Sequence, residues 1–270
     1  MSLTATSLAS GSSGNALLVR HGDAALLVDC GLSQRAIERA LARAGLRPGD
    51  LHAILLTHEH GDHTLSAPSL ARRHGVPLVA SGPTLAALSA DLAGVAVREL
   101  PVGTCAGVGA FSVRSFPVPH DAAAPVGYAI AAGNWQVGVA IDLGSWTEDV
   151  VEGLADADLV VIEANHDQTY LWSAPYSKPL KQRIHGPSGH LDNIAAGRLL
   201  ARLGADGRRR SAWLAHLSQE ANSPHIAEKV VRGVLALAGV TWINVTALPR
   251  RAPLSWSSDR HMEQMTLFES

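Results

Sequence analysis

The sequence predicts an α/β fold in which two mixed β-sheets pack together beneath outer helices. Short apolar runs typical of strands alternate with segments whose apolar residues recur at helical spacing. Each half of the chain opens with closely spaced strands joined by tight turns, a pattern typical of antiparallel hairpins. With 270 residues, 47% of them hydrophobic, the chain can bury a large core as one domain. These observations favour two sheets that share one interior.

The first half of the chain begins with strands and continues with helices and strands in alternation. A turn at His21-Gly22-Asp23 separates two of the opening strands. Ser33 is a suitable N-cap for a helix ending near Ala44, because apolar residues recur between them at helical spacing. Strands are expected at Thr4–Ala9, Ala16–Arg20, Ala24–Asp29, Ala53–Thr57, Pro77–Ala80 and Val95–Leu100, with a further helix near Ser66–His74.

The second half shows the same alternation and ends in a polar stretch. Strands are expected at Phe111–Pro117, Val126–Ala131, Gln136–Ile141, Leu159–Glu163, Ser211–Ala215 and Thr241–Val245, and helices at Ile194–Leu203 and His225–Ala238. No linker divides the chain before about Arg250, where a loose tail begins. We therefore expect one domain over residues 1–249 and a flexible tail over residues 250–270.

The composition restricts the location and the partners of the protein. A formal net charge of −2 gives no global attraction to nucleic acid, so any such binding requires a local basic patch. Cys30 and Cys105 lie far apart without CxxC spacing, which suggests thiols in a reducing compartment. We see no signal peptide and no apolar run of membrane-spanning length. A cytoplasmic protein without a membrane partner is expected.

The most informative motif is His58-Glu59-His60-Gly61-Asp62-His63, which follows the apolar strand Ala53–Thr57. Three imidazoles and two carboxylates thus crowd one loop at the end of a strand, where sites of α/β proteins usually lie. Neutral imidazole and carboxylate both donate lone pairs to divalent cations. Gly61 is expected to let the backbone turn tightly enough for its neighbours to point inward. The alternative is a solvated polar loop.

Further candidate ligands follow other predicted strands. His120 comes after Phe116–Pro119, Asp142 ends Val137–Ile141, and His216 follows Trp213-Leu214-Ala215. Each alone is an ordinary strand-terminal polar residue. Together with the histidine loop they supply seven ligands, enough for two divalent metal ions that clamp the attacking and leaving oxygens of a hydrolysis. Zinc and manganese both suit this ligand set.

The spacing His58-x-His60-x-Asp62-His63, followed by His120, Asp142 and His216, resembles the metallo-β-lactamase superfamily over nearly the whole chain. The resemblance implies the four-layer αββα sandwich of that fold. It also implies that His58, His60 and His120 hold one metal ion, that Asp62, His63 and His216 hold the other, and that Asp142 bridges them.

A second set of residues resembles the phosphodiesterase branch of the superfamily, which includes the tRNA 3′-processing endonucleases. Glu163 ends a strand, His190 precedes a helix, and His216 leads into Leu217-Ser218. In that branch a Glu–His pair donates a proton to the leaving oxygen, and a carboxylate beside an imidazole raises its proton affinity. We expect catalytic roles for His190 and Glu163, and for Asp62 in orienting the attacking hydroxide. The alternative for Glu163 and His190 is a surface acid and a polar residue at a helix start.

Several longer stretches resemble the YycJ/WalJ-like group, described as bacterial metal-dependent exonucleases that act on duplex DNA. They are Ala9–Asn15, Glu163–Asp167, Tyr176–Ile184, Gly189–Asn193 and His216–Asn222. The chain departs from the group at Asp192, where serine is usual, and at Ala221-Asn222, where an asparagine pair is usual. Both departures lie outside the expected metal ligands, so they put substrate details in doubt.

Two regions are candidates for substrate binding. Ser12 and Asn15 belong to a Ser/Gly loop whose N–H groups and hydroxyls can bind a phosphate or a terminal base. Lys178, Lys181 and Arg183 form a basic cluster. They share a segment with Tyr170, Trp172 and Tyr176, which can stack on bases. A flexible turn and aromatic packing beneath a loop are the alternatives.

The tail contains a separate motif. Gln264, Leu267 and Phe268 resemble the short peptides by which bacterial repair and replication proteins dock on the sliding clamp. Leucine and phenylalanine can enter an apolar groove while glutamine binds at its rim. A chance pentapeptide, or a tail that packs on its own domain, is the alternative.

These features together indicate a two-metal phosphodiesterase, with a DNA exonuclease of repair or replication as the favoured function. A phosphodiesterase for cyclic or modified nucleotides, or a clamp-associated adaptor with a structural metal site, remains open. A lactamase or thioesterase would leave Glu163 and His190 unexplained. The sequence leaves open the metal, the strand polarity, exonuclease against endonuclease action, DNA against RNA, the oligomeric state and the roles of His166 and His185.

Overall fold

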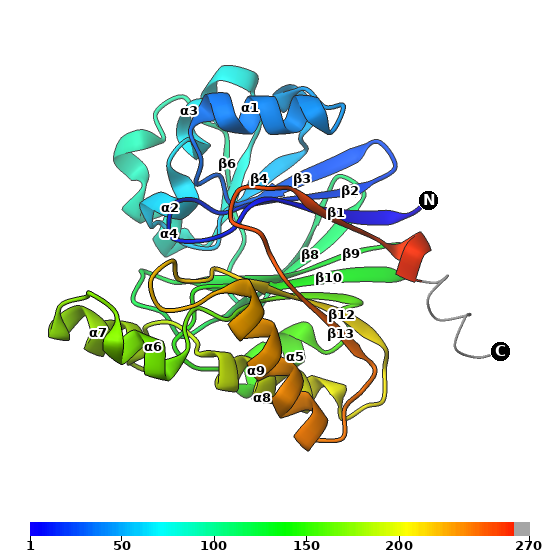
Figure 1. The fold of residues 1–270 in the computed structure, drawn as a ribbon. Helices are drawn as coiled ribbons and strands as arrows, with labels where there is room; N and C mark the ends of the chain where they lie inside the picture. The colour runs from blue at the N-terminus through cyan, green and yellow to red at the C-terminus, as the bar shows by residue number, and fades with distance from the viewer. Residues whose placement is uncertain (262–270) are drawn as a thin grey trace.

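The computed structural model describes residues 1–261, in which two β-sheets pack face to face with helices on both outer sides (Figure 1). The first sheet contains, in spatial order, β14 (Leu254–Ser257), β1 (Leu3–Ala9), β2 (Ala16–His21), β3 (Ala24–Val28), β4 (Ala53–Leu55), β5 (Leu78–Ala80) and β6 (Val97–Glu99). The second contains β13 (Ile243–Ala247), β12 (Arg210–Ala215), β11 (Leu159–Glu163), β10 (Trp135–Ala140), β9 (Val126–Ala132), β8 (Phe111–Pro117) and β7 (Cys105–Val108).

Both sheets are mixed, as the sequence predicted. In the first sheet the strands from β14 to β3 pair antiparallel and those from β3 to β6 pair parallel. The second sheet has antiparallel pairs from β7 to β10 and parallel pairs from β10 to β13. The parallel strands β4, β5 and β11 are nearly continuous apolar runs because both of their faces are buried, whereas the edge strand β6 is exposed.

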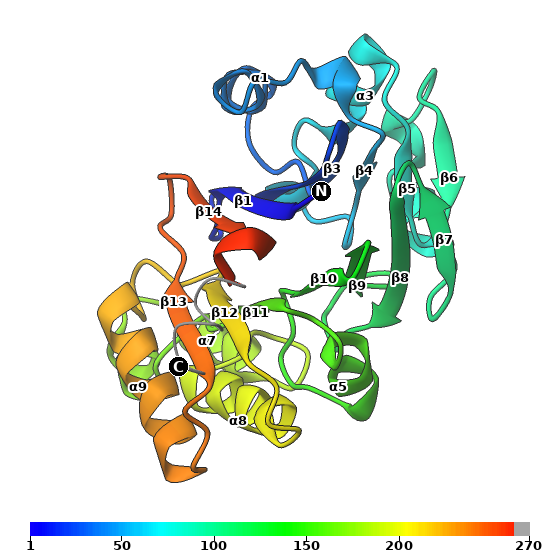
Figure 2. The ribbon, with the colours of Figure 1, turned by 90° about the vertical axis from the view of Figure 1, so that its right-hand side faces the viewer.

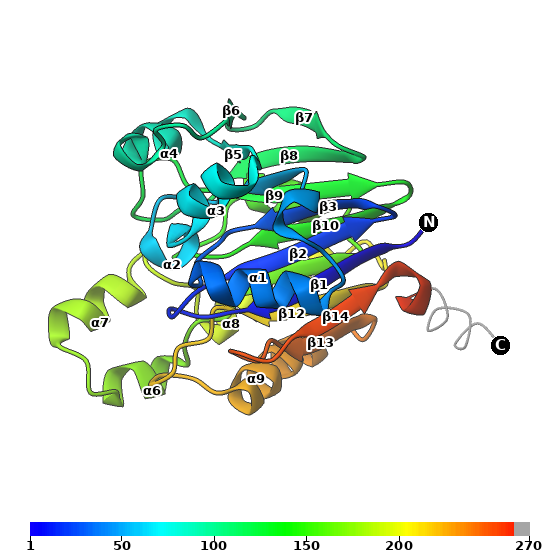
Figure 3. The same ribbon diagram turned by 90° about the horizontal axis from the view of Figure 1, so that it is seen from above.

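The outer layers are helical. The first sheet carries α1 (Gln34–Arg43), α2 (Gly61–Thr64), α3 (Ala67–His74) and α4 (Gly82–Ala87), with 3₁₀ turns at Pro48–Asp50 and Ser89–Asp91. The second carries α5 (Glu148–Leu154), α8 (Asn193–Gly204) and α9 (Pro224–Leu237). Two further helices, α6 (Gln168–Ser173) and α7 (Lys178–His185), project from one side of the molecule (Figures 1 and 3). The expected four-layer αββα sandwich is confirmed.

Local sequence signals explain where the main helices begin. The helix expected after Ser33 is α1, which buries Ile37 and Leu41 against the first sheet. Asp192 caps α8 by accepting a hydrogen bond from the backbone N–H of Ala195 at 2.8 Å. Ser223 caps α9 in the same way, with proline at the first helical position.

Three apolar layers hold the sandwich together. The inner layer, between the sheets, contains Leu26, Leu55, Tyr128 and Trp213, and one outer layer lies behind each sheet. The hydroxyl of the fully buried Tyr128 donates a hydrogen bond of 2.6 Å to the carbonyl of Leu56. This bond crosses from the second sheet to the first and satisfies a polar group that would otherwise cost about 1–3 kcal/mol to bury.

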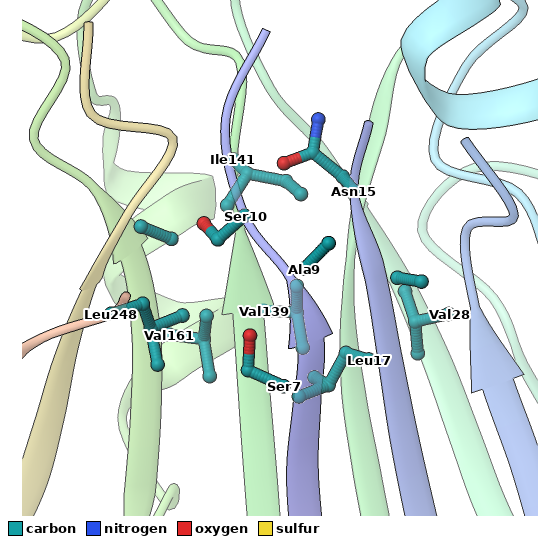
Figure 4. A pocket seen from close by; sticks show the side chains of 12 residues that line it. Ser7, Ala9, Ser10, Asn15, Leu17, Val28, Val139, Ile141, Val161 and Leu248 are labelled. Atoms are coloured by element: carbon teal, nitrogen blue, oxygen red, sulfur yellow. The ribbon is translucent and has the colours of Figure 1, made fainter. Parts of the chain in front are cut away.

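A small cavity of about 20 Å³ lies between the sheets (Figure 4). Val139, Val161 and Leu248 line it together with Ser7, whose buried Oγ has no hydrogen-bond partner among the described residues. Its volume is enough for about one water molecule. Ser10 also lines this cavity, which therefore reaches the strand ends.

The expected tail boundary at Arg250 is wrong. Leu254–Ser257 form β14, which pairs antiparallel with β1, and Trp256 packs into the inner core. The β14 sequence Leu-Ser-Trp-Ser alternates apolar and polar residues, a short strand signal that was not recognised. Residues 262–270, the rest of the expected tail, lie outside the part of the chain that the structure describes.

The helices α6 and α7 were not predicted either, although Asp167 and Ser177 are good N-caps. Asp167 accepts from the N–H of Thr169 at 2.9 Å, and Ser177 accepts from that of Leu180 at 3.4 Å. Few apolar positions in these short helices are buried, so helical periodicity is weak.

Candidate metal centre

The seven expected metal ligands come from loops at one edge of the sandwich. The histidine loop follows β4 and begins α2, while His120, Asp142 and His216 follow β8, β10 and β12. The carboxyl ends of the parallel strands β10 to β12 meet at this edge. The structure thus brings all seven residues together from both halves of the chain.

One group of ligands contains only histidines. Suitable ring nitrogens of His58, His60 and His120 all lie within 4.8 Å of one another. Nε2 of His120 is 3.3 Å from Nδ1 of His60. Three imidazoles that converge in this way match the three-nitrogen side of a metal site.

The second group mixes histidines and carboxylates. Asp62, His63, Asp142 and His216 offer ligand atoms that also lie within 4.8 Å of one another. Oδ2 of Asp142 is 2.6 Å from Nε2 of His63 and 3.5 Å from Nε2 of His58. Asp142 therefore lies between the two groups, and the family resemblance implies that it bridges their metal ions.

The buried atoms of this cluster fit a divalent metal ion. Oδ1 of Asp142 lies 2.8 Å from Nδ1 of His216. By contrast, Nε2 of His58 and Nε2 of His216 are buried without a hydrogen-bond partner among the described residues. Nε2 of His216 nevertheless faces Oδ2 of Asp62 at 3.4 Å. Unsatisfied nitrogens and oxygens that face one another are costly unless a cation accepts their lone pairs. In this fold the His/Asp cluster suggests divalent metal ions.

Neighbouring groups orient the histidines. Nδ1 of His63 lies 2.8 Å from Oδ2 of Asp29, and Nδ1 of His120 lies 3.1 Å from the carbonyl oxygen of Gly189. Such contacts fix the ring and direct Nε2 inward. Asp29 was not among the expected site residues, although it follows the apolar run Leu26-Leu27-Val28 as Asp142 follows the run that ends at Ile141.

Three residues of the site have left-handed backbone conformations. Asp29, Asp142 and His216 have φ angles of 59°, 55° and 53°, and the described residues contain no other non-glycine residue with positive φ. Each follows a strand whose direction must change before the next element. Such a conformation costs about 1–3 kcal/mol and persists only where surrounding contacts hold it. These three conformations therefore lower the stability of the fold, and they orient the three side chains toward the site.

The charges of the site are strongly coupled. Burial lowers the pKa of His63 and His216, but the carboxylates of Asp29 and Asp142 oppose it at His63, and Asp142 does so at His216. Both pKa values lie well above the usual range. Burial raises the pKa of Asp142, yet His216 and His63 hold it well below its usual value. Burial and nearby His63 lower that of His58. The cluster thus keeps Asp142 ionised.

Glu163 and His190 lie beside the ligand cluster. Oε1 of Glu163 is 2.8 Å from Nδ1 of His190, and Oε2 accepts hydrogen bonds from the backbone N–H groups of Leu143 and Leu191. Burial lowers the pKa of His190, but the charge of Glu163 and contacts with Asp142 raise it to about 9. Nδ1 is engaged by the carboxylates, which leaves Nε2 for the adjacent cavity.

A cavity of about 310 Å³ opens over the cluster. Its floor is formed by His190 and by five of the expected metal ligands, which are His60, Asp62, His120, Asp142 and His216. Tyr176, Leu180, Arg183 and Ile184, from α7 and the loop before it, form one wall. The side chains of Asp62 and His190 retain 26% and 18% exposure, so solvent reaches the floor.

The expected substrate-binding residues divide into two sets. Ser12 and Arg183 line the cavity, and Arg183 pairs with Asp121 at 2.7 Å. Lys178 and Lys181 are not among the lining residues, and Nζ of Lys181 donates to the carbonyl of Trp172 at 2.7 Å.

Asn15 is buried and does not reach the cavity, contrary to expectation. Its Oδ1 accepts from the N–H of Gly11 at 2.9 Å, and its Nδ2 lies 3.1 Å from Nε2 of His63. These contacts hold the Ser/Gly loop against the histidine loop, which explains why asparagine occupies this position.

The position near the histidine loop that requires glycine is Gly31 and not Gly61. Gly61 does not need glycine's conformational freedom, because its φ is not positive and nothing lies within 4 Å of an added Cβ. Gly31 is the restricted position. A Cβ there would lie 1.6 Å from the carbonyl oxygen of Asp62. The backbone after β3 thus packs directly against the histidine loop.

Comparison with known proteins agrees with this geometry. A family model described as the beta-lactamase superfamily domain matches residues 25–217, which include all seven clustered residues. The chain belongs to the metallo-β-lactamase superfamily. This membership and the arrangement of the cluster support a metal-dependent hydrolase.

Two similar proteins align with most of this chain. The exodeoxyribonuclease WalJ of Streptococcus pneumoniae is 37% identical over 236 residues, which cover 86% of this chain and 87% of WalJ. The exodeoxyribonuclease YycJ of Bacillus anthracis is 34% identical over 242 residues, which cover 88% and 91%. The expected resemblance to the YycJ/WalJ-like group is confirmed.

Solved structures show the same fold at lower identity. The metallo-β-lactamase fold protein YhfI of Bacillus subtilis has a TM-score of 0.71 and 18% identity, covering 94% of this chain and 99% of YhfI. The human short-form tRNase Z has a TM-score of 0.64 and 16% identity, covering 93% and 98%. Within residues 1–261, none of the helices has the length and apolar character required to cross a membrane.

Proposed function

We propose that this protein is a two-metal phosphodiesterase that degrades DNA from an end during repair or replication. The observation that carries this proposal is the Glu163–His190 pair beside two adjoining ligand groups in a solvent-accessible cavity. The two relatives named exodeoxyribonuclease support DNA as the substrate.

Seven residues would hold the metal ions, for which zinc and manganese both suit the donors. His58, His60 and His120 would hold one, Asp62, His63 and His216 the other, and Asp142 both. The chemistry that such ions supply when bound is neutralisation of charge at phosphorus and activation of water.

The side chains of this protein perform the remaining steps. His190 holds a proton at Nε2 and donates it to the oxygen that leaves phosphorus, because a departing alkoxide needs an acid. Glu163 positions His190 and raises its proton affinity. Asp62 stays ionised, since His216 and His63 offset the effect of burial on its pKa, and orients the attacking water.

Features around the cavity favour a polynucleotide over a small nucleotide. Arg183 faces the cavity from α7. Tyr170 and Trp172 of α6 are 50% and 48% exposed, unusually high for large aromatic side chains. Such exposed aromatics can stack on bases of a strand that leaves the site.

Digestion of end-labelled single- and double-stranded DNA and RNA tests the proposal. The assay is run with zinc and with manganese, and with His58→Ala as the inactive control. We expect mononucleotide or short products from a DNA end, absent in the control. Products from internal cuts would indicate an endonuclease, and cleavage of cyclic nucleotides alone would favour the small-molecule alternative. A metal-loaded protein without activity would leave only the adaptor function.

The C-terminal motif adds a partner to this proposal. Gln264, Leu267 and Phe268 lie outside the described residues, so the support for sliding-clamp binding is their sequence pattern. Deletion of residues 263–270 is expected to abolish binding to the clamp while DNA digestion continues. Unchanged clamp affinity would end this part of the proposal. A cytoplasmic location agrees with Cys30 and Cys105, which are not bridged.

A further inference from the structure

A second cavity of about 390 Å³ lies on the outer face of the first sheet and shares no lining residue with the cavity over the metal cluster. Its floor contains Thr4, Thr6 and Leu8, which are alternate residues of β1. Helix α1 borders it on one side and β14 on the other, and Figure 2 shows these elements around this end of the sheet. Alternation along β1 explains the arrangement, because residues 3, 5, 7 and 9 face the interior.

Four arginines line this cavity, and we call it the arginine groove. They are Arg20 on β2, Arg43 on α1, Arg251 before β14, and Arg260 after it. The lining, all of it within the described residues, includes no aspartate or glutamate. A net charge of −2 for the whole chain makes this concentration of positive charge local.

The groove begins close to the metal centre. Leu8, at one end of its floor, precedes the Ser10–Asn15 loop, and Ser12 of that loop lines the metal-site cavity. Arg250 joins the two regions. Its carbonyl accepts from the N–H of Ser10 at 3.3 Å, and its guanidinium donates to the carbonyl of Leu217 at 3.1 Å. From Leu8 to Thr4 the floor extends about 13 Å away from this loop.

We propose that the arginine groove binds the phosphate backbone of the nucleic-acid substrate beyond the position of cleavage. This inference rests on the proposed nuclease function. Guanidinium groups bind phosphate oxygens in a bidentate manner. Hydroxyls of Thr4, Ser255 and Ser257 in the same groove are further phosphate-binding groups. A strand that leaves the metal centre over the Ser12 loop would meet this surface next.

The test compares two double variants that remove the same charge. Arg43→Gln/Arg251→Gln removes two exposed arginines of the groove, and Arg35→Gln/Arg39→Gln removes two exposed arginines of α1 that do not line it. Binding of a fluorescent 20-nucleotide DNA is measured by anisotropy between 50 and 200 mM salt, without added metal so that nothing is cleaved.

We expect the groove variant to bind the DNA on the order of tenfold more weakly. The slope of log affinity against log salt should fall in magnitude by about 1.4–1.8, because two phosphate contacts are lost. The control variant should match the wild type. The inference is overturned if both variants keep the affinity and the salt slope of the wild type. It is also overturned if both variants lose the same affinity, because the loss would then reflect total charge and not the groove.

A second measurement separates this inference from the proposed function. With metal, the ratio of kcat/KM for the long DNA to that for a small p-nitrophenyl phosphodiester should fall in the groove variant. If the wild type cleaves neither substrate, the nuclease proposal fails while the binding data still decide the groove. If the wild type cleaves DNA and the ratio does not change, the groove has no role in the reaction.

Discussion

Oε1 of Glu163 lies 2.8 Å from Nδ1 of His190, and the same oxygen lies 2.8 Å from Nδ1 of His216. One buried carboxylate thus contacts both the candidate proton donor and a candidate metal ligand. The other oxygen accepts two backbone N–H groups, which fix the orientation of the carboxylate. The candidate proton donor His190 and the candidate metal ligand His216 are therefore positioned by a single side chain.

Replacing Glu163 with glutamine should weaken metal binding through His216 and proton donation by His190. The amide oxygen would stay on the two backbone N–H groups, so the amide N–H₂ would face both imidazoles. Each imidazole would then lose the acceptor that Glu163 offers to Nδ1 and keep only Oδ1 of Asp142, which lies 2.8 Å from His216 and 3.2 Å from His190. We expect Glu163→Gln to lower metal affinity and activity by roughly 10–100-fold. Metal content and kcat measured on the same sample check this, and normal values for both would contradict it.

His190→Ala should affect poor leaving groups most. General-acid catalysis contributes about 10²–10⁴-fold when an alkoxide departs. A p-nitrophenolate leaves without protonation, so its phosphodiester should lose much less. The measurement is kcat for DNA and for the nitrophenyl ester with the same preparation. Equal losses for the two substrates would show that His190 does not protonate the leaving oxygen.

Gly31→Ala should displace the histidine loop, whereas Gly61→Ala should be tolerated. An added Cβ at Gly31 meets the backbone of Asp62, which cannot rotate away, but at Gly61 it meets nothing within 4 Å. We expect Gly31→Ala to lower metal content and the unfolding temperature, with Gly61→Ala as the matched control. A stable, metal-replete Gly31→Ala protein would contradict the close packing of these two segments.

Asp206 should make stability depend on pH in acid. Its hydrogen bonds with the fully buried Arg210 lower its pKa from 3.8 to about 2. The unfolded chain therefore binds the proton more tightly, and the stabilisation present above about pH 4 is lost as pH falls toward 2. Since Asp206 is about half exposed, we expect Asp206→Asn to cost only about 1 kcal/mol at pH 7.

Urea unfolding of the wild type and Asp206→Asn at pH 7, 4 and 3 measures this effect. The difference between the two proteins should shrink as the pH falls. Asp156→Asn is the control, because Asp156 is exposed and lies 3.9 Å from Arg208. A constant difference across the pH range would show that the Asp206–Arg210 pair is not its source.

The two cysteines should differ in reactivity. Burial raises the pKa of Cys30 to about 12, despite its hydrogen bond with Ser66, so almost no thiolate forms near neutral pH. Cys105 is exposed. A thiol reagent should therefore label one cysteine in the native protein and two after unfolding, with Cys105→Ser removing the native signal. Rapid labelling of two thiols in the native state would contradict the burial of Cys30.

Much of this architecture could be predicted because its signals are local. The parallel strands are apolar runs that end in polar ligands, and Ser33, Asp192 and Ser223 are recognisable starts or caps of helices. The meeting of the histidine loop with His216 could be expected because both follow apolar strands, while the division of the ligands between two metal ions came from the family resemblance.

What the sequence did not reveal depends on tertiary contacts. Asp29 is one strand-terminal acid among several until the structure places it on His63. Asn15 lies in a Ser/Gly loop of the kind that binds phosphate, yet its hydrogen-bond partners are Gly11 and His63 of the protein itself. β14 alternates apolar and polar residues over only four positions, and its partner β1 lies about 250 residues earlier in the chain, so its place in the first sheet depends on a distant contact.

The pairing of β14 with β1 has a consequence for synthesis on the ribosome. Residues 3–9 are synthesised long before their neighbour at residues 254–257. Until then one border of the nascent sheet keeps unpaired backbone groups, which attract other chains. The nascent polypeptide should therefore be prone to aggregate through this border until residues 254–257 have left the ribosome and paired with β1.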